Sequence, residues 1–361
     1  MEAKRYNNIK LAISIGKGIV TFAMIFLFVY TGLSKSLVEY LRSYSSNPYV
    51  VFLLFVLVTS FVLAVIFWPL SFYSEFYLEH KYKLSNQTFL QWIWEDLKGV
   101  LVGGVIGIPV MLIFYYAIRT YGNLWWLIFA IIMFLLSVVL AKFLPVIILP
   151  LFYKVKPIEN EELKNRVLKL AEKAGMKVEN IFQFNMSKNT KKVNAMFTGL
   201  GKTKKIILGD TLLNEYTTDE IETVIAHEMG HYKHKHIIKN LFIGTVSSFL
   251  MFFLIAYFYQ ISLSWFSFSN ISQIAALPVL SLWAMIIGFL MEPLTNIISR
   301  KFEYQADEYA VKSTNKKQIF KNTLNKLTEQ NLSDKDPHPL IEWLFYSHPS
   351  IKNRAAHIES L

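Results

Sequence analysis

The chain contains no cysteine. This excludes disulfide bonds, a thiol nucleophile and a cysteine-ligated metal. Charged side chains are also scarce, at 17% of 361 residues, whereas 53% of the residues are hydrophobic. Soluble domains average roughly 25% charged residues. The composition therefore predicts a multi-span membrane protein with an attached polar part.

The charge that is present is mostly positive, with a formal net charge of +11 at pH 7. Such a balance is compatible with nucleic-acid binding in a soluble protein. In a membrane protein, lysine-rich cytoplasmic loops beside anionic lipid explain the same excess. We therefore expect the lipid bilayer as a partner and no nucleic acid.

Six apolar stretches approach or exceed the roughly 20 residues that a transmembrane helix needs. The first is too long for a cleavable signal peptide. Lysine and arginine are concentrated before the first stretch, between the fourth and fifth, and after the sixth, so the positive-inside rule predicts cytoplasmic termini and a cytoplasmic active-site face. The six stretches are 11–33, 49–73, 99–118, 124–152, 241–263 and 271–298.

The polar segment between the fourth and fifth stretches has the pattern of a folded α+β unit. A helical period over 159–174 is followed by a predicted strand at 178–184 and a hairpin, formed by 192–197 and 204–208 around Gly199-Leu200-Gly201. Thr217-Thr218-Asp219-Glu220 has the capping-box pattern and begins another helix. We expect that helix to continue through Ile237 into the fifth membrane span.

These patterns divide the chain into four predicted segments. They are membrane helices 1–4 at 1–153 with a cytoplasmic loop at 74–98, an α+β insert at 154–236, membrane helices 5–6 at 237–300 and a cytoplasmic C-terminal segment at 301–361.

The α+β insert carries the motif His227-Glu228-Met229-Gly230-His231. Residues four apart lie on one helix face, so the two imidazoles can bind one Zn²⁺ while Glu228 polarises a water molecule. His234 lies about 10.5 Å along a straight helix from His227, too far for both to bind one ion. His236 is expected to face elsewhere. The third ligand must therefore come from another element.

A second polar motif follows the sixth apolar stretch, at Ser299–Asp307. Glu303 and Asp307 are four residues apart, so one carboxylate can bind zinc while the other accepts a hydrogen bond from a ligating histidine. A solvated charged helix end is the alternative interpretation. Glu292, inside the sixth stretch, receives no role.

Together these motifs resemble the type I CAAX prenyl proteases, which are integral-membrane zinc metallopeptidases. The resemblance extends from about Phe67 to Arg354. It also includes Glu79-His80-Lys81, Asn86-Gln87-Thr88, Val193–Leu200, Ile206-Ile207-Leu208, Asp210–Leu213 and Ser347-His348-Pro349.

The resemblance implies that the six predicted transmembrane helices surround a large water-filled chamber, with a small α+β zinc-metallopeptidase domain. It implies roles for nine residues. They are His227, His231 and Glu303 as ligands of one Zn²⁺, Glu228 as catalytic base, Asp307 as support for a ligating histidine, Asn194 and Ala195 as the edge strand that pairs with substrate, and His348 and Arg354 facing the scissile carbonyl.

The chain also departs from the family pattern. Eukaryotic members have seven spans, and the one missing here corresponds to the first. The loop between the last two spans is short, and His234 does not belong to the motif. The short form resembles prokaryotic members, which predicts an inner-membrane protein and favours membrane-protein quality control over prenylated substrates.

We therefore predict a membrane-embedded zinc metalloendopeptidase acting on peptide or protein substrates. Two alternatives stay open at the level of the sequence. A site-2-type intramembrane protease takes its third ligand from Leu-Asp-Gly, whereas this chain has Leu208-Gly209-Asp210. A six-span transporter or metal-binding protein would not need Glu228, and no pair of broken spans indicates inverted repeats.

Overall fold

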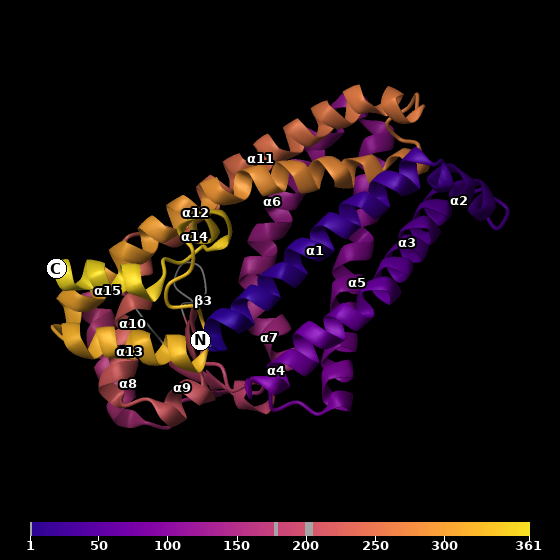
Figure 1. The fold of residues 1–361 in the computed structure, drawn as a ribbon. Coiled ribbons are helices and arrows are strands. Elements are labelled where there is room, and N and C mark those ends of the chain that lie inside the picture. The colour runs from indigo at the N-terminus through magenta and orange to yellow at the C-terminus, as the bar shows by residue number, and fades with distance from the viewer. Residues whose placement is uncertain (1, 177–179, 199–204) are drawn as a thin grey trace.

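The computed structural model describes residues 2–176, 180–198 and 205–361. Six of its helices are long and apolar enough to cross a membrane, which confirms the predicted number of spans. They run obliquely through the elongated molecule in Figure 1. Their bounds are α1 Glu2–Tyr30, α3 Pro48–Ser71, α5 Phe89–Thr120, α6 Trp125–Phe143, α11 His236–Ser262 and α12 Pro278–Thr314.

Shorter helices connect these spans and build the polar end of the molecule. A π-helical turn, Phe72–Tyr77, follows α3 just after its internal Pro69, which cannot donate a backbone hydrogen bond. A second π-turn, Leu144–Ile148, follows α6. The remaining α-helices of the described residues are α2 Leu33–Arg42, α4 Leu78–Lys81, α7 Leu149–Phe152, α8 Glu161–Lys173, α9 Asp210–Glu215, α10 Thr218–Lys233, α13 Lys317–Gln330, α14 Pro339–Phe345 and α15 Ile351–Ser360.

A four-stranded sheet in the order β1-β2-β4-β3 lies at the polar end. β2 and β4 are parallel, whereas β1–β2 and β3–β4 are antiparallel, so the predicted hairpin is confirmed and β3 is an edge strand. The predicted turn Gly199-Leu200-Gly201 and positions 178–179 of the predicted strand lie outside the described residues. The strands are β1 Val155–Pro157, β2 Asn180–Phe184, β3 Ala195–Thr198 and β4 Lys205–Gly209.

Helix α10 begins as the capping box predicts but ends earlier than expected. The Thr217 side chain accepts a hydrogen bond from the backbone of Glu220, and the Glu220 carboxylate accepts one from the backbone of Thr217. The prediction of a continuous helix through Ile237 is wrong, because Lys235 adopts the left-handed conformation with φ 56°. That conformation stops an α-helix. α10 and α11 are therefore two helices with different directions (Figure 1).

Two large hydrophobic cores lie in the two halves of the molecule. One joins the membrane helices around Phe52, Tyr115 and Tyr259. The other joins α8, the sheet, α10, α13 and α15 to the C-terminal end of α12, through buried residues such as Met229 and Phe320. The predicted segments 154–236 and 301–361 thus share one core.

The first two spans are attached to the polar end through Glu79, which lies on α4. Its carboxylate accepts a hydrogen bond from Tyr6 on α1 at 2.5 Å and ion pairs with Lys10 and Lys192, each at 2.9 Å. Because Lys192 lies just before β3, this one carboxylate connects α1 and α4 with the edge strand. The adjacent Asn7 donates a hydrogen bond to the Leu332 carbonyl.

Candidate metal centre

The two histidines of α10 and a carboxylate of α12 converge at the polar end. Nε2 of His227 lies 3.2 Å from Nε2 of His231. The two Glu303 oxygens lie 3.4 Å and 3.3 Å from these nitrogens. One ligand atom from each residue lies within 4.8 Å of the others. The structure therefore brings the three predicted ligands together around one point.

The chemistry of this cluster fits a divalent cation. Glu303 is 4% exposed, and its Oε2 has no hydrogen-bond partner among the described residues beyond the 3.4 Å approach to His227. Burial alone would lower the pKa of His227, but hydrogen bonds to Asp307 and Glu303 raise that pKa to about 9. Asp307 and Glu303 thus favour a positive charge at the position of this cluster. Two nitrogens and one carboxylate are a usual ligand set for catalytic zinc, with the fourth position open.

Asp307 lies behind His227, the first predicted ligand. Its Oδ1 is 2.8 Å from Nδ1 of His227, so the Nδ1–H donates to it and leaves Nε2 free for a metal. Arg354 from α15 donates to both Asp307 oxygens, through Nε at 2.9 Å and through Nη2. The guanidinium is therefore engaged with Asp307, and its Nη1 is 3.8 Å from Glu303. The role of Arg354 at the scissile carbonyl stays a prediction.

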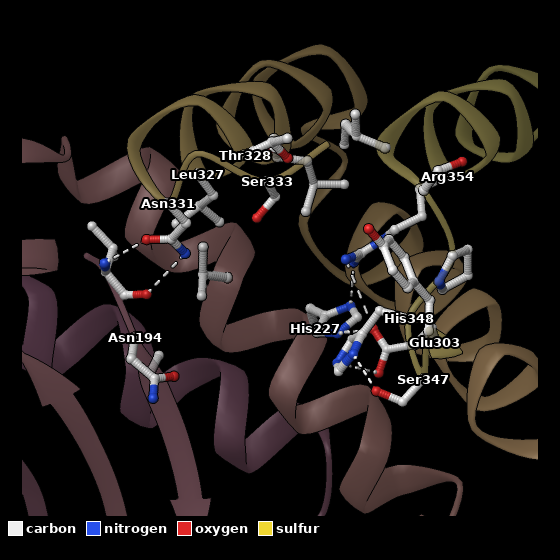
Figure 2. Close-up of a pocket in the computed structure, with 18 of the residues that line it drawn as sticks. Asn194, His227, Glu303, Leu327, Thr328, Asn331, Ser333, Ser347, His348 and Arg354 are labelled. Atoms are coloured by element: carbon white, nitrogen blue, oxygen red, sulfur yellow. Dashed lines mark hydrogen bonds and ion pairs between the residues drawn. The ribbon is translucent and has the colours of Figure 1, made fainter. Parts of the chain in front are cut away.

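The cluster opens into a cavity of about 690 Å³. Glu228, directly after His227 in the sequence, lines this cavity, as do Asn194 and Ala195. His348 approaches from the other side, with Nε2 3.5 Å from Glu303 and with 66% of its side chain exposed. Figure 2 shows His348, Glu303 and Arg354 gathered around His227, with Asn194 and Asn331 across the cavity.

Among the described residues of this edge, Ala195 at the start of β3 presents its backbone groups to the cavity. The Asn194 carbonyl accepts a hydrogen bond from Gly209, opposite it on β4. Because antiparallel partners alternate, the N–H and C=O of Ala195 point away from β4, towards the open edge. The outward groups of Val193 are already bonded to the Asn331 side chain, at 2.7 Å and 3.2 Å (Figure 2). Of the predicted pair, Ala195 therefore offers its backbone and Asn194 only its side chain.

The sequence interpretation missed three residues at this site. Asn331 is one, and its contact with Val193 joins positions 138 residues apart, which no local pattern indicates. His236 is the second, and the expectation that it faces elsewhere is wrong: its Nδ1 lies 3.0 Å from Nδ1 of His231. Gln305 is the third, with Oε1 2.8 Å from Nε2 of His236. His234 lies outside the cluster, as expected.

Six candidate membrane spans among the described residues, an HExxH helix and a carboxylate from a distant helix beside it at a cavity define a class, the integral-membrane metallopeptidases. The comparisons with known proteins agree. Residues 157–361 match the model of peptidase family M48, and residues 1–154 match the model described as CAAX prenyl protease N-terminal, five membrane helices. The chain belongs to peptidase family M48, and the resemblance to the CAAX prenyl proteases is confirmed. Within residues 2–154 the structure has four candidate spans.

Individual relatives support the same assignment. The uncharacterized metalloprotease YhfN of Bacillus subtilis is 30% identical over 362 residues, which cover 99% of this chain and 84% of the relative. CAAX prenyl protease 1 of Saccharomyces cerevisiae is 33% identical, covering 79% of this chain and 67% of the relative. The crystal structure of S. mikatae Ste24p superposes with a TM-score of 0.88 at 28% identity, covering 99% of this chain and 88% of the other.

Proposed function

We propose that this membrane metalloendopeptidase uses Zn²⁺ and cleaves extended peptides that enter the cavity beside β3. The proposal is carried by one observation, the convergence of His227, His231 and Glu303 at a cavity that Glu228 also lines. His227, His231 and Glu303 would hold the Zn²⁺ ion, which would supply Lewis acidity and would lower the pKa of a water molecule at the open position towards about 7.

The chain's own residues perform the proton transfers in this proposal. Glu228 takes a proton from the attacking water and delivers it to the leaving amine, a role that requires a carboxylate open to the cavity. His348, exposed in the cavity near Glu303, donates a hydrogen bond to the carbonyl oxygen as negative charge develops there. Arg354 acts through Asp307, by fixing the carboxylate that orients His227.

The substrate backbone pairs with the edge of β3 in this proposal. Strand addition recognises extended peptides through main-chain hydrogen bonds, and Ala195 has both of its groups available. The relatives named CAAX prenyl protease make prenylated peptides one substrate class to compare with unmodified ones.

The test uses the purified full chain in detergent and an unstructured polypeptide as substrate. Removing metal with a chelator should abolish cleavage, and adding Zn²⁺ should restore it. The Glu228→Gln protein, treated in the same way, is the control for contaminating proteases. Cleavage that survives complete metal removal would contradict the proposal.

We also propose that the metal site faces the cytoplasm. The polar segments on the same side of the membrane helices as the metal site are rich in lysine and arginine, and the positive-inside rule places such segments in the cytoplasm. The absence of cysteine makes this directly measurable. Single cysteines at half-exposed Lys164, on α8, and at exposed Ser46, between α2 and α3, provide a pair from the two ends of the molecule. In intact cells a membrane-impermeant maleimide should label Ser46→Cys but not Lys164→Cys, and the reverse pattern would reject the orientation.

A further inference from the structure

The turn between α10 and α11 places a third histidine behind a metal ligand. On a straight helix, residues five apart would lie about 140° apart around the axis, so His231 and His236 would not meet. The left-handed Lys235 ends α10 and lets α11 begin at His236 in a new direction. As a result, Nδ1 of His236 lies 3.0 Å from Nδ1 of His231.

The position of His236 is fixed from the α12 side. The imidazole is 1% exposed and stacks on Phe302, with ring centroids 4.1 Å apart and planes inclined by 8°. Its Nε2 lies 2.8 Å from Oε1 of Gln305. Phe302 and Gln305 flank the ligand Glu303 on α12, so one helix holds both the carboxylate ligand and His236.

The hydrogen-bond chemistry of this chain assigns the protons. An amide oxygen can only accept, so Nε2 of His236 carries the hydrogen and donates it to Gln305. In a neutral imidazole the other nitrogen is then an acceptor, so Nδ1 of His236 accepts from Nδ1–H of His231. The lone pair of His231 is left on Nε2, which faces Glu303 and His227.

We propose that His236 and Gln305 are positioning residues for the metal: through two successive hydrogen bonds they hold His231 in the tautomer that can bind the ion. This inference rests on the proposed function of the site. It gives α12 a role at both imidazoles, since Asp307 orients His227 directly and Gln305 orients His231 through His236. Both relations place a hydrogen-bond acceptor behind a ligating histidine.

The experiment measures the Zn²⁺ dissociation constant of the full chain in detergent, by competition with a fluorescent chelator. His236→Phe keeps an aromatic ring to stack on Phe302 but removes the acceptor, so zinc binding should weaken about 10- to 100-fold. His236→Gln restores a carbonyl acceptor and should recover part of the loss. His234→Phe is the matched control, because His234 stacks near His236 at 5.5 Å yet lies outside the metal cluster.

Gln305 tests the second hydrogen bond. Gln305→Glu presents only acceptor oxygens and should keep or strengthen zinc binding, whereas Gln305→Met should weaken it. If Gln305 acts through His236, the double variant His236→Phe with Gln305→Met should bind zinc as the single His236→Phe variant does. Thermal unfolding of the zinc-free proteins, run in parallel, detects a merely structural effect.

The outcomes separate this inference from the proposed function. Wild-type protein that binds no zinc would reject the proposed function itself. A zinc-binding wild type with unchanged affinity in His236→Phe would overturn only the inference. So would weaker binding in Gln305→Glu, or a loss of zinc-free stability in His236→Phe without a loss of affinity. If His236→Phe does not fold, the Gln305 pair decides the question.

Discussion

Gly230 of α10 lies directly against Ala306 of α12. A Cβ atom built on Gly230 would come within 2.8 Å of the Ala306 Cα and 3.0 Å of its carbonyl oxygen. Gly230 lies between the predicted metal ligands His227 and His231 of α10, and Ala306 lies between Glu303 and Asp307 of α12. The missing side chain therefore allows the close approach of the two helices that carry the candidate metal site.

Gly230→Ala should consequently weaken the metal site. The added methyl group meets backbone rather than a flexible side-chain end, so α10 and α12 must separate, at a cost of about 1–3 kcal/mol. We expect a lower thermal stability and a larger Zn²⁺ dissociation constant. Gly244→Ala on α11, where a new Cβ meets nothing within 4 Å, is the matched control. Zinc affinity equal to wild type in Gly230→Ala would show that the close approach is not needed.

Glu228→Gln should separate catalysis from metal binding. The amide cannot accept the proton of the attacking water, so turnover should fall about 10²- to 10⁴-fold, as expected for loss of a general base. Because Glu228 is not among the three clustered ligands, bound zinc should stay at the wild-type level. The measurement is peptide cleavage together with metal content on the same preparation. Loss of zinc in parallel with activity would instead make Glu228 part of the metal site.

Arg354→Ala should destabilise the protein, beyond any effect on catalysis. Asp307 is fully buried and paired with Arg354 through two atoms, so removing the guanidinium leaves a buried charge that has lost a partner. Losses of about 3–5 kcal/mol are typical of such changes. Thermal unfolding should show the loss. The control is Lys352→Ala: Lys352 lies on α15 like Arg354 but forms an exposed ion pair with Asp336, so its loss should change stability little. Unchanged stability in Arg354→Ala would restrict Arg354 to a direct role on substrate.

Ala195→Pro should weaken substrate binding and leave the fold intact. Proline is tolerated on an edge strand where its missing N–H faces outward, and the Ala195 N–H faces away from β4. Losing one substrate hydrogen bond should lower kcat/KM about 3- to 10-fold, with zinc content unchanged. Met196→Pro, in contrast, removes a hydrogen bond to β4 and should destabilise the sheet. Wild-type kcat/KM in a folded Ala195→Pro protein would argue against pairing with substrate at this position.

The sequence predicts the features that depend on local spacing. The helix start at Thr217 follows from capping chemistry, and the shared face of His227 and His231 follows from helical periodicity. The six spans follow from the length of the apolar stretches. Helical spacing singles out the pair Glu303 and Asp307 without deciding which carboxylate binds the metal, and the resemblance to the CAAX prenyl proteases assigns that role to Glu303.

Features that depend on tertiary packing could not be read from the sequence. The end of α10 depends on Lys235 in a left-handed conformation, for which lysine carries no sequence signal. Without that turn, the contact between His231 and His236 cannot be anticipated. Arg354 likewise meets Asp307, 47 residues earlier in the chain, because α15 packs against α12.

The central claim is that two imidazoles of α10 and a carboxylate of α12 hold one zinc ion. Anomalous diffraction at the zinc edge, on crystals of the purified full chain, tests it most directly. We predict one peak per chain, bounded by Nε2 of His227, Nε2 of His231 and the Glu303 carboxylate, which disappears in Glu303→Ala crystals. A peak at another position, or a peak that persists unchanged in Glu303→Ala, would contradict the account.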